Sequence, residues 1–594
     1  MLKFLPLAKT LFSRLCRSPF VLSLLLGLGL AGGLFALTFF NDAHAAHPLA
    51  GQALSHWLQA IEEGSEQGRE ESSADARTRE AGDKRTTWFY QQRSYPLDEI
   101  PVNARQEAVA AWEKTERAQA ELRARGKLAA LAEQNTPWVP LGPRPVYGGQ
   151  TFGARARAGD NIELAQASAV AGRVTALALD PRYNGTTNQT VYLGAAQGGL
   201  WRSTNNGQSW TPLTDDLPSL AIGAIAIDPI NPATIYIGTG EPNRSGDSYY
   251  GAGLFKTTDG GKTWTQITGP ISTSDPKLPV FLNCTFSRIA IDPTNPQIIF
   301  VATNTGFLLS AATTPGPAPL GNRGLWRSLD GGTTWFNVNP GVSNLDKSAS
   351  DVLIDPRNPR TVYAAIVGEG IFRSDSGGEL LTWKYLNRGL PARTDSKDND
   401  LYERIVLTAG PTIGSQVNST LYAAFAGVDD TLLGIYRSTD NGENWTAITR
   451  PQQPGQANYN LALTADPTNG NVLYYGTSAN SGYTGGTVFR TLDAGRSWED
   501  ISVDPLTLNN NQPQRIGLHP DTHVITVSPI NSNVLFTGND GGVWRTDSAK
   551  GTWRWNNLNN SLSITQFQSV ALHPFDPDYV IGGTQDNGTN AYIG

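Results

Sequence analysis

The sequence of 594 residues contains only two cysteines and six histidines. Cys16 lies in a segment that is expected to direct export, so we expect a mature monomer without an intrachain disulfide. Cys284, the other cysteine, is then expected to be a small residue of the core. Typical zinc sites need clustered His and Cys ligands, and the histidines here are mostly isolated. We therefore expect no metal ion and no other cofactor.

The sequence also lacks the features of nucleotide-binding and nucleic-acid-binding proteins. The formal net charge is −7, and the basic residues are scattered among acidic ones. No basic stripe with interleaved aromatic residues is present, so nucleic acid is not an expected partner. Glycine-rich phosphate loops and the nucleophile elbow of serine hydrolases are absent as well.

The first part of the chain differs in composition from the rest. Basic residues precede an apolar run at residues 20–40, which is followed by Ala-His-Ala. Residues 1–46 are therefore expected to be a secretory signal or, if uncleaved, a membrane anchor. In either case we expect an extracellular, periplasmic or surface-anchored protein. Residues 47–135 are polar and rich in alanine, which predicts a linker and then a helix over residues 103–133.

A turn sequence recurs along residues 136–594. Its first two copies are STNNGQSW at residues 203–210 and TTDGGKTW at residues 257–264, and five intact and two altered copies are present. An Asp or Asn side chain that bonds its own backbone, followed by a glycine with positive φ, makes a tight turn between two strands. The closing Trp then covers the turn. We expect a structural role for the Asp or Asn of the intact copies, which are Asn205, Asp259, Asp330, Asp440 and Asp493.

A second phrase recurs eight times, and one copy reads AIAIDPINPATIYIG at residues 224–238. Its two apolar strands are separated by an Asp-Pro turn, so each repeat predicts four antiparallel strands. One such unit cannot bury both of its faces, whereas units packed around an axis can. The repeats therefore predict an all-β propeller of seven or eight four-stranded blades over residues 136–594, with eight favoured. The segment at Trp138 would then complete the last blade; the alternative is that the chain is a piece of a longer protein.

These repeats resemble those of the Asp-box (BNR-repeat) propellers, a group that includes sialidases, xyloglucanase-type glycosidases and the luminal domain of sortilin. The phrases DPINPATIYIGTGEP and GGTQDNGT are most similar to those of bacterial secreted propellers of the sortilin-like kind. The resemblance implies that a sialidase would carry an Arg in a Phe/Tyr-Arg-Ile-Pro phrase before the first box. That phrase is absent, so sialidase activity is not expected. The xyloglucanase-type enzymes resemble two facing propellers, of which one is complete here.

Function is expected at the end of the propeller opposite the repeated turns, because the loops there vary most in length. These loops combine carboxylates with aromatic rings, which suits sugar binding. The candidate catalytic residues are Glu241, Asp540, Asp247 and Asp586. Candidate ligand-binding residues in the same loops are Tyr249, Tyr250 and Gln197. Further polar residues there are Glu369, Asp429, Asp430, His519 and Asp521.

A second set of candidates emerges when the first strands of the repeats are aligned on the Asp-Pro turn. Four residues before the turn, three consecutive repeats carry Arg288, Asp351 and Arg404, whereas the other repeats carry small or apolar residues. The structural interpretation is an ion pair between blades, buried near the axis. The functional interpretation is a site for a carboxylated or sulphated ligand. We favour the first because Asp351 balances the charge locally.

Two classes of function remain. The leading prediction is an exported scaffold that binds a protein, a peptide or a glycan at the loop face or in the central channel. The alternative is a glycoside hydrolase of the BNR-repeat type that uses a pair of loop carboxylates. Glycoside hydrolysis needs two carboxyl groups about 5 to 10 Å apart across a cleft. The loops supply enough acids for such a pair, but the sequence does not choose one.

Overall fold

The computed structural model describes Gln91, residues 104–124 and most of residues 141–593, with the longest gaps at 152–168 and 306–322. The expected signal or anchor segment, Cys16 and Trp138 lie outside the described residues. The expected helix is present as α6 (Ala104–Ala124), and most of its described side chains are exposed. Among the described residues, no helix has the length and apolar character that a membrane crossing requires.

The described strands form seven sheets of four antiparallel strands each, in which consecutive strands pair with one another. The first strands are β1 (Val174–Leu179), β5 (Ile222–Ile227), β9 (Cys284–Ile291), β13 (Ala349–Ile354), β17 (Tyr402–Gly410), β21 (Ala462–Ala465) and β27 (Thr522–Val527). The second strands are β2 (Val191–Ala195), β6 (Ile235–Gly240), β10 (Ile299–Thr305), β14 (Val362–Ile366), β18 (Thr420–Gly427), β22 (Leu473–Gly476) and β28 (Leu535–Asn539). The third strands are β3 (Leu200–Ser203), β7 (Tyr250–Thr257), β11 (Gly324–Ser328), β15 (Gly370–Ser374), β19 (Leu432–Ser438), β23 (Val488–Thr491) and β29 (Gly542–Thr546). The outer strands are β4 (Thr211–Pro212), β8 (Thr265–Ile267), β12 (Phe336–Asn337), β16 (Trp383–Leu386), β20 (Thr446–Ile448), β24 (Glu499–Asp500) and β30 (Asn556–Asn557).

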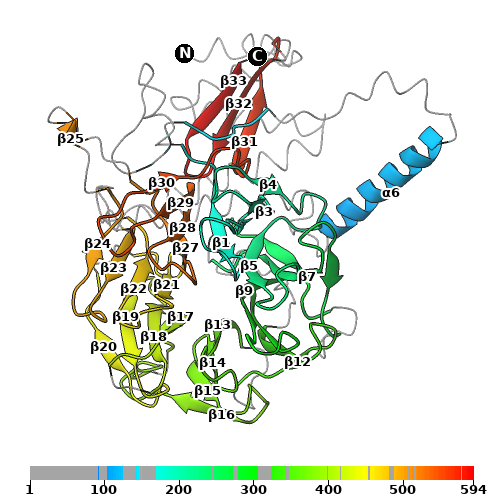
Figure 1. Cartoon of the computed structure of the whole chain (residues 1–594). Coiled ribbons are helices and arrows are strands. Elements are labelled where there is room, and N and C mark those ends of the chain that lie inside the picture. The colour runs from blue at the N-terminus through cyan, green and yellow to red at the C-terminus, as the bar shows by residue number, and fades with distance from the viewer. Residues whose placement is uncertain are drawn as a thin grey trace, which may run out of the picture. The chain divides into compact units, whose positions relative to one another are not determined.

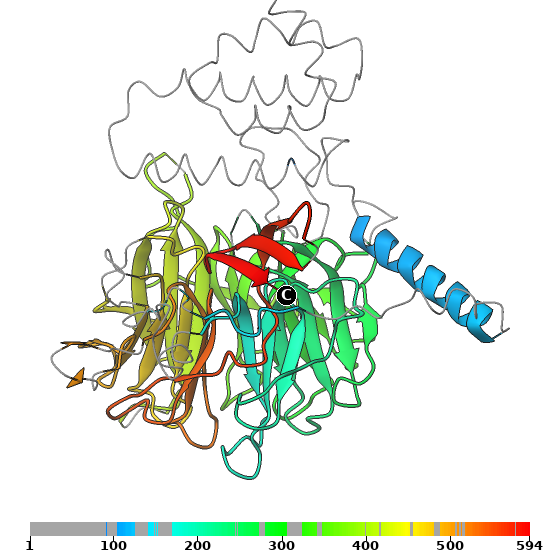
Figure 2. The same cartoon turned by 90° about the horizontal axis from the view of Figure 1, so that it is seen from above.

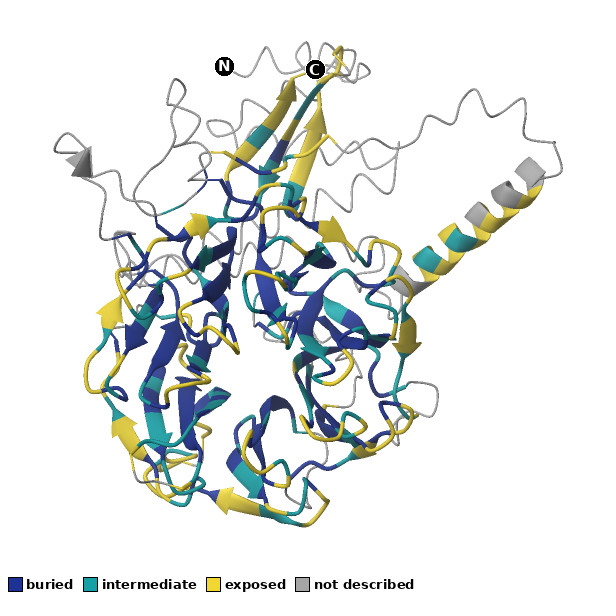
Figure 3. Cartoon of the chain, in the orientation of Figure 1, coloured by how far each residue is buried: buried dark blue, intermediate teal, exposed yellow. Residues whose placement is uncertain are grey.

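These sheets are the blades of a propeller, as the sequence predicts (Figure 1). Each first strand contacts the first strand of the next blade, and β1 contacts β27, so the ring closes after seven blades. Both faces of a blade are thereby covered by its neighbours, and Figure 3 shows the buried residues concentrated in the inner strands of the ring. A short hairpin, β25 (Leu508–Asn509) with β26 (Gln512–Pro513), lies between the last two blades in the sequence.

The eighth repeat lies outside the ring, which corrects the preference for eight blades. It forms a three-stranded sheet, β31 (Phe567–Leu572), β32 (Tyr579–Thr584) and β33 (Thr589–Ile593), beside the junction of the first and last blades (Figures 1 and 2). The pairing of β31 with β32 has the same register shift as the pairing of β1 with β2. However, Val570 is 59% exposed, whereas Leu177, at the matching position of β1, is 8% exposed. Counting repeats overestimates the number of blades, because a repeat can form its strands without becoming part of the ring.

The repeated turns share one hydrogen-bond pattern. In the first copy Ser203 Oγ donates to Asn205 Oδ1 at 2.8 Å and accepts from the Gly207 N–H at 2.8 Å. Gly207 has a φ of 87°, a value that favours glycine. In a later copy, hydrogen bonds from Thr334 and Ser328 lower the pKa of Asp330 to about 2. The Asp and Asn side chains of these turns are thus occupied within the turn.

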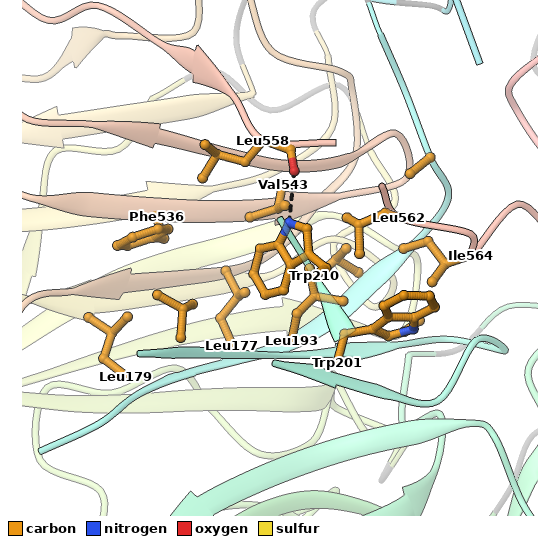
Figure 4. Close-up of a cluster of buried hydrophobic side chains, with 14 of the residues drawn as sticks. Leu177, Leu179, Leu193, Trp201, Trp210, Phe536, Val543, Leu558, Leu562 and Ile564 are labelled. Carbon is orange, nitrogen blue, oxygen red and sulfur yellow. Dashed lines mark hydrogen bonds between the residues drawn. The ribbon is translucent and has the colours of Figure 1, made fainter. Parts of the chain in front are cut away.

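The ring closes on an apolar cluster between its first and last blades. Leu177 and Leu193 from the first blade pack with Phe536 and Val543 from the last (Figure 4). Trp210, which ends the first repeated turn, lies in this cluster, and its Nε1–H donates to the Leu558 carbonyl oxygen at 2.9 Å. Apolar packing at this seam therefore joins segments more than 300 residues apart.

Replacing Trp210 by Ala is expected to lower the free energy of unfolding by about 3–5 kcal/mol, because a packed indole and its hydrogen bond are lost together. The measurement is the midpoint of urea unfolding. Trp112→Ala is the matched control, since Trp112 on α6 is 51% exposed, and its midpoint is expected to stay at the wild-type value. Equal effects of the two substitutions would contradict closure of the ring at this seam.

Candidate functional site

A buried arginine, Arg173, lies at the end of the ring opposite the repeated turns. It directly precedes β1 and is 3% exposed. The preceding Gly172 has a φ of 153°, and a Cβ there would lie 2.2 Å from the carbonyl oxygen of Ile564. Glycine therefore lets the chain that leads to the eighth repeat pass directly over the start of β1.

Three carboxylates from two other blades surround the Arg173 guanidinium. Its Nε lies 3.0 Å from Asp540, which is in the connection between β28 and β29. Its Nη1 lies 3.1 Å from Glu241 and 3.3 Å from Asp247, both in the connection between β6 and β7. All four side chains are almost completely buried. The cluster thus joins the first, second and last blades, and charge-assisted hydrogen bonds of this kind are strong.

Asp540 has two further partners. Tyr459, from the loop before β21, donates its hydroxyl to Asp540 Oδ2 at 2.7 Å. His523, in β27, has its Nε2 2.6 Å from Asp540 Oδ1. The Tyr459 ring also lies beside the guanidinium, with 5.1 Å between its centroid and Arg173 Cζ. The Asp540 carboxylate is therefore held by three side chains, Arg173, Tyr459 and His523, which fix its position.

The eighth repeat covers this cluster. Gln566 donates from Nε2 to Asp247 Oδ2 at 2.8 Å, and Asn587 donates from Nδ2 to the main-chain oxygen of Asp540 at 3.1 Å. The side chain of Asp586, in the connection between β32 and β33, is hydrogen-bonded to that of Asp540. Two segments of the eighth repeat thus complete a site that the ring alone would leave open.

The site contains more acids than cations, so its acids do not all have the same protonation state. Burial disfavours the charge on Asp540, but Arg173 and His523 outweigh it and hold the pKa of Asp540 well below its usual range. Burial, and then the charge of Asp540, raise the pKa of Asp586 to about 7. The same two causes raise the pKa of Asp521 well above its usual range. An ionised carboxylate therefore lies beside a carboxyl that keeps its proton up to neutral pH.

The other two carboxylates on Arg173 also differ from each other. Burial raises the pKa of Glu241, although Arg173 opposes the shift. For Asp247 burial is outweighed by Arg173 and by hydrogen bonds from Ser245 and Gln566, so its pKa is lowered. Paired acids whose environments separate their pKa values can act as the acid and the base of a proton transfer.

The structure brings the four candidate catalytic residues together, since Glu241, Asp247, Asp540 and Asp586 all belong to this cluster. The other loop candidates lie around it. Gln197 donates from Nε2 to the main-chain oxygen of Asp247 at 2.9 Å, and the main-chain oxygen of Tyr249 accepts from the Glu241 N–H at 2.9 Å. Tyr250, at the start of β7, is partly exposed.

Two other loop carboxylates have separate roles. Glu369 lies 2.7 Å from Arg393, in an ion pair outside the cluster. Asp429 accepts hydrogen bonds from Thr431 within its own turn. Glu369 and Asp429 thus have partners of their own outside the buried cluster on Arg173.

Sequence reasoning did not identify Arg173, Tyr459 and Gln566. In the alignment of the repeats they share one column, and Asp521 belongs to it as well. This column lies three residues before the one that contains Arg288, Asp351 and Arg404. The other repeats carry uncharged residues there, among them Ala221, Thr285, Ser348 and Leu401. Large polar or charged side chains occur in this column only in the first repeat and the last three repeats, a signal that alignment could have revealed.

The second set of candidates lines the central cavity, which has a volume of about 630 Å³. Arg288 Nε lies 3.8 Å from Asp351 Oδ1. Arg404 instead donates from Nη1 to the main-chain oxygens of Asn458 and Tyr459, each at 3.0 Å. The expected ion pair between blades therefore forms only loosely and on one side. Glu241, Asn243 and His523 line the same cavity. Among the described residues, no three His, Cys, Asp or Glu side chains are arranged so that they could hold a metal ion.

Comparisons with known proteins place the chain near polysaccharide hydrolases. No family model matches it. A xyloglucanase from Paenibacillus sp is 27% identical over 390 residues, which cover 61% of this chain and 31% of that protein. The xyloglucanase Xgh74A of Acetivibrio thermocellus is 26% identical over 356 residues, which cover 54% of this chain and 37% of that protein. These relatives are xyloglucanases. The chain spans about a third of their length.

A solved structure supports the fold. An ancestral GH74 enzyme superposes with a TM-score of 0.50 at 19% identity, over 77% of this chain and 54% of that one. The relatives correct the leading prediction of function: proteins similar to this chain are glycoside hydrolases, so a scaffold that only binds a protein, peptide or glycan is the wrong conclusion. They favour the alternative, a glycoside hydrolase.

Replacing Arg173 by Met is expected to destabilise the protein by about 3–5 kcal/mol at pH 8, because three buried carboxylates lose their cation. The loss should be smaller at pH 5, where Asp586 holds its proton and burial favours the protonated form of Glu241, so fewer negative charges are left uncompensated. The measurement is the urea midpoint at both pH values. Arg182→Gln, which removes an exposed arginine paired with Asp180, is the control. An Arg173→Met variant as stable as this control at pH 8 would contradict the arrangement.

Proposed function

We propose that the protein is an exported glycoside hydrolase that cleaves xyloglucan or a related polysaccharide. Similarity to xyloglucanases over more than half of the chain supports this proposal. The chain spans only part of these relatives, so the assignment of the reaction depends on its own residues. The observation that carries the proposal is the carboxyl cluster on Arg173, in which ionised and protonated acids lie side by side.

Asp586 is the proposed general acid. Glycoside hydrolysis requires an acid that protonates the oxygen of the leaving sugar, and its pKa must be raised for that purpose. Burial and the charge of Asp540 raise the pKa of Asp586 to about 7, so its proton is available at mildly acidic and neutral pH. Asp586 is also less buried than Asp540, which gives a substrate better access to it.

Asp540 cannot be the second carboxyl group of the reaction. Its side chain is hydrogen-bonded directly to that of Asp586, whereas two carboxyl groups that act on a glycosidic bond are about 5 to 10 Å apart. We assign Asp540 the role of keeping the proton on Asp586. The proposed second carboxylate is Asp247, which is ionised and bound to a different nitrogen of Arg173 from Asp540. It would activate water or attack the sugar.

Export and the type of repeat belong to the same proposal. The basic and apolar segments of residues 1–46 support export, and action on a polysaccharide outside the cell agrees with it. The shared hydrogen-bond pattern of the repeated turns supports their assignment as Asp boxes of the BNR type. The phrases at residues 228–242 and 582–589 support a secreted, sortilin-like subgroup.

Incubation with xyloglucan is expected to release reducing ends, measured by a colorimetric assay across pH 5 to 8. Asp586→Asn and Asp247→Asn should each lower kcat by about 10²–10⁴-fold, as the loss of a general acid or base does. Asp540→Asn should lower the pKa of Asp586, so activity should decline at a lower pH than in the wild type. Asp259→Asn, an equally conservative change in an exposed repeated turn, is the control and should retain activity. Release of no reducing ends, or full activity of Asp586→Asn, would overturn the proposal.

A further inference from the structure

The walls of the central cavity differ in chemistry around the ring. One residue of each first strand, in the column aligned on the Asp-Pro turn, lines the cavity. On β9, β13 and β17 these residues are Arg288, Asp351 and Arg404. On the other four first strands the matching residues are Ala176, Ala224, Ala462 and Val524. The cavity therefore has a charged arc over three adjacent blades and an apolar arc over the other four.

Arg288 is the cation of this arc that remains available to a ligand. Its side chain is 51% exposed, and its 3.8 Å separation from Asp351 is too long for a hydrogen bond. Within the described part of the chain, no hydrogen bond to its guanidinium is found. A channel-lining guanidinium with two or more unused N–H donors can bind a planar carboxylate in a bidentate manner.

The acids near Arg288 do not neutralise it fully. Asp351 accepts hydrogen bonds from the main-chain N–H groups of Leu407 and Val352, each at 2.8 Å, so its oxygens are directed at the backbone. Glu241 is hydrogen-bonded to Arg173. Glu403 also lines the cavity, and so do the cations Arg404 and Arg323. The cationic groups of the cavity are thus concentrated on the wall that contains Arg288.

We propose that the central cavity is a subsite for an acidic sugar, whose carboxylate binds Arg288 while its C–H face packs against the apolar arc. The cavity volume of about 630 Å³ is in the range of ligand-binding sites. Glu241 and His523 line the cavity and also belong to the cluster on Arg173, so the cavity extends to the cluster that contains the proposed catalytic groups. This inference rests on the proposed hydrolase function and extends its substrate class from neutral xyloglucan to related polysaccharides that carry uronic acids.

Calorimetric titration of the full chain with a trimer of galacturonic acid tests the subsite. The trimer is expected to bind at least about tenfold more tightly than its carboxyl-reduced, neutral counterpart, as a charge-assisted hydrogen-bonded pair would give. Arg288→Gln should remove that difference, while binding of the neutral trimer stays unchanged. Arg182→Gln, which removes an exposed arginine of the first blade between β1 and β2, away from the cavity lining, should preserve the difference. Raising the salt concentration should lower the affinity for the acidic trimer and leave the affinity for the neutral trimer unchanged.

Equal binding of the acidic and neutral trimers by the wild-type protein would overturn the subsite, as would an unchanged preference in Arg288→Gln. The wild-type comparison needs no variant, so it decides the matter even if Arg288→Gln folds poorly. Failure of the hydrolase proposal would look different. In that case xyloglucan and acidic polysaccharides would release no reducing ends, and the binding preference for the acidic trimer would persist.

Discussion

The ion pairs of one buried arginine connect the closure of the ring to its chemistry. Moving a guanidinium out of water is costly unless several partners compensate it, and Arg173 has three carboxylates within hydrogen-bonding distance. These partners come from the second and last blades, so the cluster holds together the blades on both sides of the first. Apolar packing around Trp210 joins the first and last blades in the body of the ring, and the ion pairs join them at the loop end.

The same cluster determines which acids keep their protons. One guanidinium and one histidine cannot neutralise five neighbouring acids, so burial forces some of them to stay protonated. Asp540 holds the negative charge because Arg173, His523 and Tyr459 all point toward it. That charge, together with burial, raises the pKa values of Asp586 and Asp521. The eighth repeat contributes Asp586 and Gln566, so a sheet outside the ring supplies groups to the site.

The sequence predicted the blades and the end of the ring that carries the site, because both follow from local patterns. Turn chemistry and alternating apolar residues repeat within each blade, and the loops that vary lie at one end. It also selected the carboxylates that meet in the cluster, since Glu241 and Asp540 lie in short glycine-flanked loops. Arg173 was missed because its partners are 68 and 367 residues away, and no local pattern records such a contact. The number of blades was overestimated because ring closure depends on packing angles between blades, which repeats do not encode.

Infrared difference spectroscopy of the carboxyl groups tests the central claim most directly, namely that the cluster on Arg173 keeps Asp586 protonated up to neutral pH. The wild-type protein is expected to lose the absorption of a protonated carboxyl group as the pH rises from 6 to 8. Asp586→Asn should lose the part of this change that comes from Asp586, and Asp540→Asn should shift that part to lower pH. A wild-type spectrum in which every carboxyl group is already ionised at pH 6 would contradict the account.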